Sequence, residues 1–184
     1  MGFKPSDIAR VFEALRSEGV KAVVIGDTIP QLLLGTRELE GDLDLFVYEP
    51  SPLVDQDFYR ELASRRGWEV SSTEIGTVKL IVPLEDGYLS VELYENYMDL
   101  EIPGRILEEA VEVEVDGVRV EMLPLEAYLV LKARQGVDLD KLGEYVRKLG
   151  RRVNRKLVKE LAGEYPEDEY ELILDRLREA GLNI

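Results

Sequence analysis

Residues 23–47 read VVIGDTIPQLLLGTRELEGDLDLFV, and this stretch decides the fold. The apolar run Lys21–Ile25 predicts a short buried strand, and Gly26-Asp27-Thr28 predicts a tight turn after it. Pro30 favours the start of a helix. Alternating residues over positions 42–48 then predict a second strand with one largely acidic face. A strand, a turn, a short helix and another strand therefore follow each other within about 30 residues.

The rest of the chain continues mainly as strands and ends as helices. An apolar stripe predicts a helix over residues 7–18 with Ser6 as its N-cap. Further predicted elements are a helix at residues 53–65, strands at 68–71, 77–82, 88–94, 111–115 and 118–122, and helices at 125–135, 139–149, 154–163 and 167–180. The layout is α+β, with an α/β domain over residues 1–123 and a C-terminal helical region over 124–184 that we expect to pack on it.

The composition restricts the chemistry. The chain has 184 residues, no Cys, no His and a formal net charge of −15. Disulfide scaffolds, Cys/His zinc sites, thiol nucleophiles and His general bases are therefore excluded. The negative charge repels duplex nucleic acid and anionic membranes. Scarce Gln and Asn with abundant Glu and Arg resemble thermophile usage, and without a signal-peptide pattern or an apolar run of about 20 residues the expected location is cytoplasmic.

Acidic residues on two predicted strands form the candidate site. Asp42 and Asp44 are two positions apart, so strand alternation places both carboxylates on one face. Glu92 and Lys79 point outward from the later strands by the same rule. Three carboxylates and a Lys suit a divalent cation with a bound phosphate, because Mg²⁺ prefers carboxylate and phosphate oxygens. Two plainer interpretations stay open: the aspartates are charges on an exposed strand face, and Glu92 is the cross-strand partner of Lys79.

The stretch at residues 23–47 resembles the nucleotidyltransferase superfamily, whose signature is a Gly-Gly or Gly-Ser turn after a strand, a short helix and an Asp-x-Asp strand. The resemblance implies a small mixed sheet flanked by helices, with a C-terminal helical part. It also implies that Asp42, Asp44 and Glu92 hold Mg²⁺ or Mn²⁺. The implied reaction passes a nucleoside monophosphate from a nucleoside triphosphate (NTP) to a hydroxyl acceptor.

The turn Gly26-Asp27-Thr28 and the helix after it provide backbone N–H groups and a positive dipole end that could receive phosphates. Gly26, Thr28 and Arg37 would position them, and Lys79 lies near the acids. The later stretch MLPLEAYLVLKARQGVDLDKL looks like the helical region of the abortive-infection toxin and minimal nucleotidyltransferase branch, with Lys132 in the apolar helix. That Lys would reach the same site from the helical part.

The sequence is also compatible with functions other than a transferase. Asp27 stands where the family has a second Gly or a Ser, which favours a catalytically inactive binding or regulatory module, such as one partner of a toxin-antitoxin pair. A third interpretation is an acidic surface protein whose Asp-x-Asp is incidental, and it predicts that Glu92 lies far from Asp42 and Asp44. The acceptor of a transferase is left open between a small molecule, a protein and RNA. A protein partner or a homodimer is compatible with either function, whereas a membrane is not expected.

A basic stretch contrasts with the acidic remainder of the chain. Residues 147–159 contain seven Lys and Arg residues and no acid. One interpretation is a surface that binds phosphate or RNA. The other is a solvated pair of helices that complements the acidic sheet domain, within the chain or in a dimer.

Overall fold

The computed structural model describes residues 2–184, which divide into two compact units. The first unit holds the chain up to Glu101 together with Val111–Met122, and the second holds Ile102–Ala110 and Leu123–Ile184. A central sheet with flanking helices confirms the predicted α+β class. Within residues 2–184, none of the helices combines the length and the apolar character that a membrane span needs.

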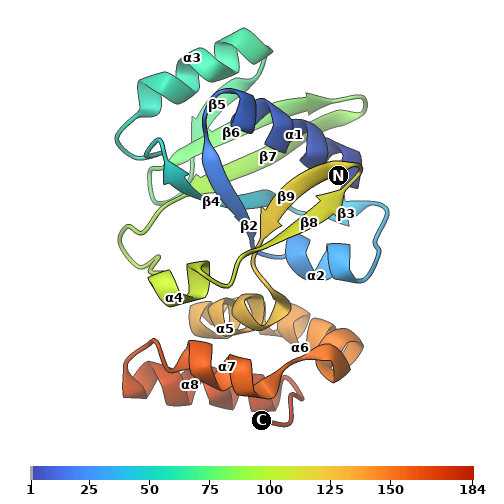
Figure 1. Cartoon of the computed structure of the whole chain (residues 1–184), viewed down its shortest axis with the longest axis vertical. Coiled ribbons are helices and arrows are strands. Elements are labelled where there is room, and N and C mark those ends of the chain that lie inside the picture. Colours follow the sequence, from blue (N-terminus) through green and yellow to red (C-terminus); the bar gives the residue numbers. More distant parts are fainter. Residues whose placement is uncertain (1) are drawn as a thin grey trace. The chain divides into compact units, whose positions relative to one another are not determined.

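The first unit is built on a seven-stranded mixed sheet with the strand order β5-β6-β7-β4-β2-β9-β8 (Figure 1). Its strands are β2 (Lys21–Ile25), β4 (Leu43–Glu49), β5 (Glu69–Ser72), β6 (Val78–Leu84), β7 (Gly87–Tyr94), β8 (Val111–Val115) and β9 (Val118–Met122). The central strands β4 and β7 run parallel, as do β2 and β9, and the other neighbouring pairs are antiparallel. A separate two-stranded pair joins β1 (Gly2–Phe3) to β3 (Leu39–Glu40).

Eight α-helices are found among the described residues, three in the first unit and five in the second. The first unit contains α1 (Pro5–Ser17), α2 (Thr28–Leu33) and α3 (Gln56–Arg66), and the second contains α4 (Gly104–Leu107), α5 (Leu125–Gln135), α6 (Leu139–Leu149), α7 (Arg155–Ala162) and α8 (Glu167–Glu179), with the 3₁₀ turn η1 (Gly150–Arg152) between α6 and α7. On the sheet, α1 packs against β8 and β9, and α3 packs against β5 and β6.

Strand alternation separates a buried face of the sheet from a half-exposed one. Leu43, Leu45 and Val91 are fully buried, whereas Asp44 and Glu92, which alternate with them, are half-buried. Because successive side chains on a strand point to opposite faces, the apolar set forms the core and the acidic set lies on the other face. The sheet core therefore holds the acidic face in place.

Two helices begin earlier than the sequence predicts. Ser6 is wrong as the N-cap of the first helix, because α1 begins at Pro5 with Lys4 as its cap. The backbone N–H of Lys4 donates a 2.8 Å hydrogen bond to Asp7 Oδ2, so a carboxylate in the first turn helps to close the helix start. Likewise α2 begins at Thr28 rather than at Pro30. Proline fits the first turn of a helix at more than one position, so its presence does not fix the first residue.

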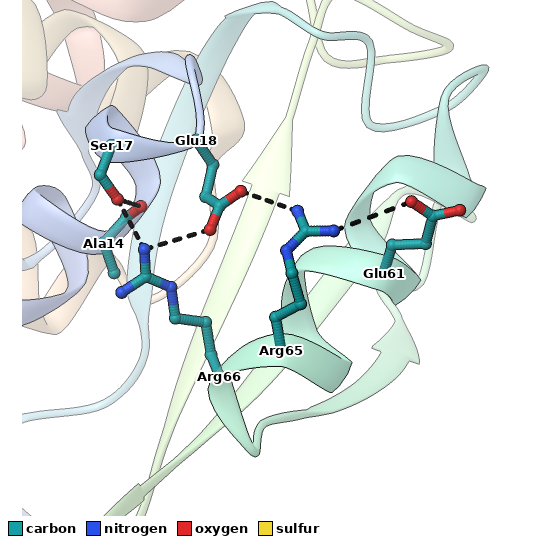
Figure 2. A network of polar contacts seen from close by, with 6 residues as sticks. All are labelled: Ala14, Ser17, Glu18, Glu61, Arg65 and Arg66. Carbon is teal, nitrogen blue, oxygen red and sulfur yellow. Dashed lines mark hydrogen bonds and ion pairs between the residues drawn. The ribbon is translucent and has the colours of Figure 1, made fainter.

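A polar network at the surface ties α1 to α3 (Figure 2). Glu18 accepts hydrogen bonds from Arg65 Nη2 at 2.7 Å and from Arg66 Nη2 at 3.1 Å. Arg66 also donates to Ser17 Oγ, which in turn donates to the carbonyl oxygen of Ala14. The hydrogen bond from Arg65 lowers the pKa of Glu18 below its usual range. We call this cluster the surface network, and it joins two helices of the first unit.

The second unit is a helical bundle arranged around α5. Tyr128 of α5 and Tyr145 of α6 are buried and meet edge to face, with ring centroids 6.0 Å apart. Arg176 of α8 donates to the carbonyl oxygens of Ala133 and Arg134 in the last turn of α5. A cation at this position satisfies carbonyls that have no partner within the helix. Aromatic packing and a charged cap therefore hold α5 against its neighbours.

Candidate functional site

Two acids of the candidate site, Glu92 and Asp44, lie in a row of residues across neighbouring strands, which we call the acidic row. Asp44 of β4 is in register with Glu92 of β7, and Glu92 is in register with Lys79 of β6. On the other side, Asp44 is in register with Ile25, the last residue of β2. The row therefore runs Lys79, Glu92, Asp44 and then the turn that follows β2. The incidental Asp-x-Asp interpretation expects Glu92 far from the aspartates, and this register is the opposite arrangement.

The turn after β2 lies directly against the Asp44 carboxylate. Gly26 has a φ of +76°, and a Cβ atom at this position would lie 2.2 Å from Asp44 Oδ2. No real Cβ contact is that short, so only glycine allows both the left-handed turn and the present position of Asp44. The sequence predicts Gly26 for its turn, and the structure adds that the missing side chain makes room for a carboxylate.

Thr28, the first residue of α2, carries a buried polar atom beside this turn. Its side chain is 1% exposed, and within residues 2–184 its Oγ1 atom has no hydrogen-bond partner. A buried hydroxyl without a partner is unfavourable, because it has lost its water and gained nothing in return. Asp27, between the two, is half-buried and takes the N-cap position of α2. Thr28 therefore offers an unused hydrogen-bonding group next to the acidic row.

A buried glutamine fixes the segment that leads to Asp42. Gln31 of α2 is 6% exposed, and its side-chain amide donates to the carbonyl oxygen of Glu40 at 3.0 Å. In return, the backbone N–H of Glu40 donates to Gln31 Oε1 at 2.8 Å. Both backbone groups of Glu40 are thereby held two residues before Asp42, which itself is exposed and precedes β4. Sequence analysis misses this role, because the only signal is a polar residue inside a short apolar helix.

Glu92 is engaged by two donors from neighbouring positions. Lys79 Nζ lies 2.5 Å from Glu92 Oε1, and the Tyr94 hydroxyl donates to Glu92 Oε2. The cross-strand interpretation of the Lys79 and Glu92 pair is therefore confirmed. The hydrogen bond to Glu92 raises the pKa of Lys79, and the negative charge of Asp42 adds to this effect. Lys79 is thus held firmly in its charged form.

Tyr94 reports how much negative charge the site carries. Burial is the first cause of its raised pKa, followed by its hydrogen bond to Glu92. The charges of Asp44 and Asp42 raise the pKa of Tyr94 further, because each disfavours a second negative charge nearby. Tyr94 therefore stays a neutral hydrogen-bond donor. Three carboxylates act on its hydroxyl group, and one of them, Glu92, is in contact with Lys79.

The donor set at the site fits a divalent cation held by two carboxylates. In the part of the chain that the structure describes, residues 2–184, no three acidic side chains come close enough together to hold one metal ion. Asp42 and Asp44 nevertheless supply hard oxygen ligands, and Mg²⁺ commonly binds one or two carboxylates with substrate phosphates and waters. The space left by Gly26 and the unpartnered hydroxyl of Thr28 favour a polar group at the same place. A metal-ligand role for Glu92 stays a prediction.

The other predicted phosphate and site residues lie elsewhere in the chain. Arg37 is exposed in the segment between α2 and β3. Lys132 belongs to the second unit, where its side chain is 10% exposed and its Nζ atom lies 3.7 Å from Asp138 Oδ2. The seven basic residues of positions 147–159 are all exposed there. Roles for Arg37, Lys132 and this basic stretch at the site stay predictions.

The fold is similar to that of nucleotidyltransferase-like proteins. An antigenic nucleotidyltransferase-like protein from Paracoccidioides brasiliensis is similar in structure, with a TM-score of 0.66 and 14% identity over 97% of this chain and 90% of that one. The antibiotic-resistance factor ANT(2'')-Ia aligns with a TM-score of 0.49 and 15% identity over 96% of this chain and 88% of its own. No curated protein sequence matches the chain.

The particular family follows from the sequence as a whole. Residues 4–179 match the family described as nucleotidyl transferase of unknown function (DUF2204), and the chain belongs to this family. The predicted resemblance to nucleotidyltransferases is therefore confirmed, together with the nucleotidyltransferase-like fold.

Proposed function

We propose that this chain is a nucleotidyltransferase that binds an NTP together with Mg²⁺ or Mn²⁺ and transfers the nucleoside monophosphate to a hydroxyl acceptor. The observation that carries the proposal is the position of Asp44, in register with Glu92 on one side and fitted into the space left by Gly26 on the other. A carboxylate beside a glycine turn can bind a cation, and the backbone of the turn can bind a phosphate next to that cation.

In this proposal some residues of the site bind the cation and others bind the phosphates. Asp42 and Asp44 would hold the ion, and Glu92 lies in register with Asp44 on the neighbouring strand. The backbone at Gly26 and the Thr28 hydroxyl would hold phosphate oxygens, and Arg37 is a further candidate. When bound, the ion would polarise the α-phosphate and favour loss of the acceptor proton. The acceptor oxygen then forms a bond to the α-phosphorus, its proton leaves to water, the bond from the α-phosphorus to the β-phosphate oxygen breaks, and pyrophosphate departs.

The first test is calorimetric titration of the folded protein with ATP and the other NTPs, with and without Mn²⁺. We expect binding that needs the ion and that falls by about tenfold or more in Asp42→Asn/Asp44→Asn, since metal-site changes of this kind have effects of that size. The matched control is Glu112→Gln/Glu114→Gln, which removes an exposed acidic pair with the same spacing from β8. Equal losses in both variants would contradict the assignment of the site.

A second candidate function is a binding or regulatory module of the same fold without turnover, as in one partner of a toxin-antitoxin pair. The contacts of Glu92 favour it, because Lys79 and Tyr94 already occupy both carboxylate oxygens. Asp27 at the start of α2 adds a negative charge next to the proposed phosphate position. This module would show no metal-dependent NTP binding in the calorimetric titration, although the wild-type protein is folded.

A further inference from the structure

We propose that Lys79 competes with a divalent cation for Glu92, so that the third acid stays out of the metal coordination as long as Lys79 is present. The inference rests on the proposed function for the identity of the cation, and it gives a role to a residue that is not itself a metal ligand. Lys79 is in this sense a positioning residue: it acts on the ion through Glu92.

The first argument is the way both oxygens of Glu92 are used. Oε1 lies 2.5 Å from Lys79 Nζ, and Oε2 accepts the hydrogen bond of Tyr94. The Glu92 side chain is 13% exposed and that of Lys79 is 26% exposed, so water screens the pair only in part. A metal ion that binds Glu92 must therefore displace at least one of these donors.

The second argument is geometric. Lys79 and Glu92 face each other in register on two antiparallel strands, so the sheet itself keeps the ammonium beside the carboxylate. Asp44 is the next residue along the same row, on β4. A tethered cation competes at a high effective concentration, whereas a metal ion must come from solution.

The third argument concerns charge. Glu92 and Lys79 form an ion pair, so the charges of these two side chains cancel. Asp42 and Asp44 carry two further negative charges, two positions apart in the sequence. A divalent ion held by these two aspartates would match their charge without Glu92.

The test is a titration of the protein with Mn²⁺ alone, followed by the paramagnetic resonance signal of the free ion. We expect Lys79→Met to bind Mn²⁺ about tenfold more tightly than wild type, a change of the size produced by altering the partners of a metal ligand. In wild type, Glu92→Gln should leave Mn²⁺ binding unchanged. In the Lys79→Met background, the same substitution should abolish the gain.

Two controls separate competition for Glu92 from other effects. Lys21→Met breaks a Lys–Glu cross-strand pair of the same kind at the far end of β2, where Lys21 contacts Glu49, and it changes the net charge by the same amount. It should not tighten Mn²⁺ binding. Lys79→Arg keeps the positive charge and should resemble wild type, and circular dichroism checks that each variant is folded.

Several outcomes would overturn the inference. These are unchanged Mn²⁺ affinity in folded Lys79→Met, an equal gain in Lys21→Met, or weaker Mn²⁺ binding in Glu92→Gln alone. Because the measurement uses the metal without nucleotide, its result is independent of the NTP titration. A protein that binds Mn²⁺ as expected but never binds NTP would retain the role of Lys79 and lose the proposed transferase function.

Discussion

Glu18 in the surface network and Glu92 in the acidic row each accept hydrogen bonds from two side chains, but the charges around them differ. Glu18 contacts two arginines, and Arg65 also pairs with Glu61, so two acids and two arginines balance there (Figure 2). Glu92 contacts one Lys and a neutral Tyr, and the charges of Asp42 and Asp44 act on the same Tyr. The surface network holds equal numbers of acids and arginines, whereas three carboxylates and one Lys act around Tyr94.

This difference fits a structural contact in the first case and the proposed binding site in the second. Arg65 is 51% exposed, and exposed ion pairs of this kind contribute little because water and salt screen them. The acidic row is half-buried on the face opposite the core, where repulsion between carboxylates is less well screened. Carboxylates that lie close together in a half-buried place favour a ligand-binding role over a stabilising one.

The largest effect is expected from a glycine substitution in each region. Gly26→Ala would place a Cβ atom 2.2 Å from Asp44 Oδ2 in a left-handed turn, so it should lower the free energy of unfolding by about 2 kcal/mol or more and abolish NTP binding. Gly67→Ala adds a Cβ atom at a φ of +67° at the end of α3. Among the described residues, no atom beyond the adjoining backbone lies within 4 Å of that Cβ position. It should destabilise by about 1 kcal/mol and leave binding intact.

Chemical denaturation with NTP calorimetry measures both effects. The two glycines share a left-handed backbone, so the difference between the variants isolates the contact with Asp44. Equal destabilisation and intact NTP binding in both variants would mean that the turn is structural in the same way as the end of α3.

The next effect compares one cation from each cluster. Lys79→Met should lower the free energy of unfolding by about 2 kcal/mol at neutral pH, because it removes a charged hydrogen bond and leaves the carboxylates without a counter-charge. Added Mn²⁺ should restore part of this loss, because it binds the folded state. Arg65→Met should cost less, and Mn²⁺ should not restore it, because Glu18 keeps Arg66. Thermal melts of both variants with and without Mn²⁺ measure these effects. Equal stabilisation of both variants by Mn²⁺ would contradict the difference between the acidic row and the surface network.

The sequence predicts local elements well and non-local contacts poorly. The hairpin of β8 and β9 has the predicted bounds, because alternation and an Asp-Gly turn are encoded within twelve residues. Asp44 and Glu92 are in register on strands that are almost 50 residues apart in the sequence, and the sequence of neither strand indicates which strand pairs with it. The predicted strand faces therefore limited the site to a few residues without establishing that they meet.

Two features of the site depend on contacts that no pattern encodes. Gln31 matters because Glu40, nine residues later, offers it both backbone groups. Gly26 reads as an ordinary turn glycine, and its second role appears only once Asp44 lies against it. For Glu92, the sequence left a metal role and a pair with Lys79 open, and only the structure confirms the pair.

The smallest effect is expected at Glu18, and its pH dependence gives it a distinct signature. The hydrogen bond from Arg65 lowers the pKa of Glu18 below the ordinary value of 4.5, so the folded state favours the charged carboxylate. The resulting stabilisation is present above pH 4.5 and is lost as the pH falls through the lowered pKa of the folded state. Glu18→Gln should therefore lower the melting temperature slightly at pH 7, and the difference from wild type should shrink at acid pH. Glu13→Gln removes the same charge from the exposed side of α1 and corrects for the change in net charge. A Glu18→Gln difference that stays constant across pH 4.5 would mean that the arginines hold α1 to α3 without using the charge of Glu18.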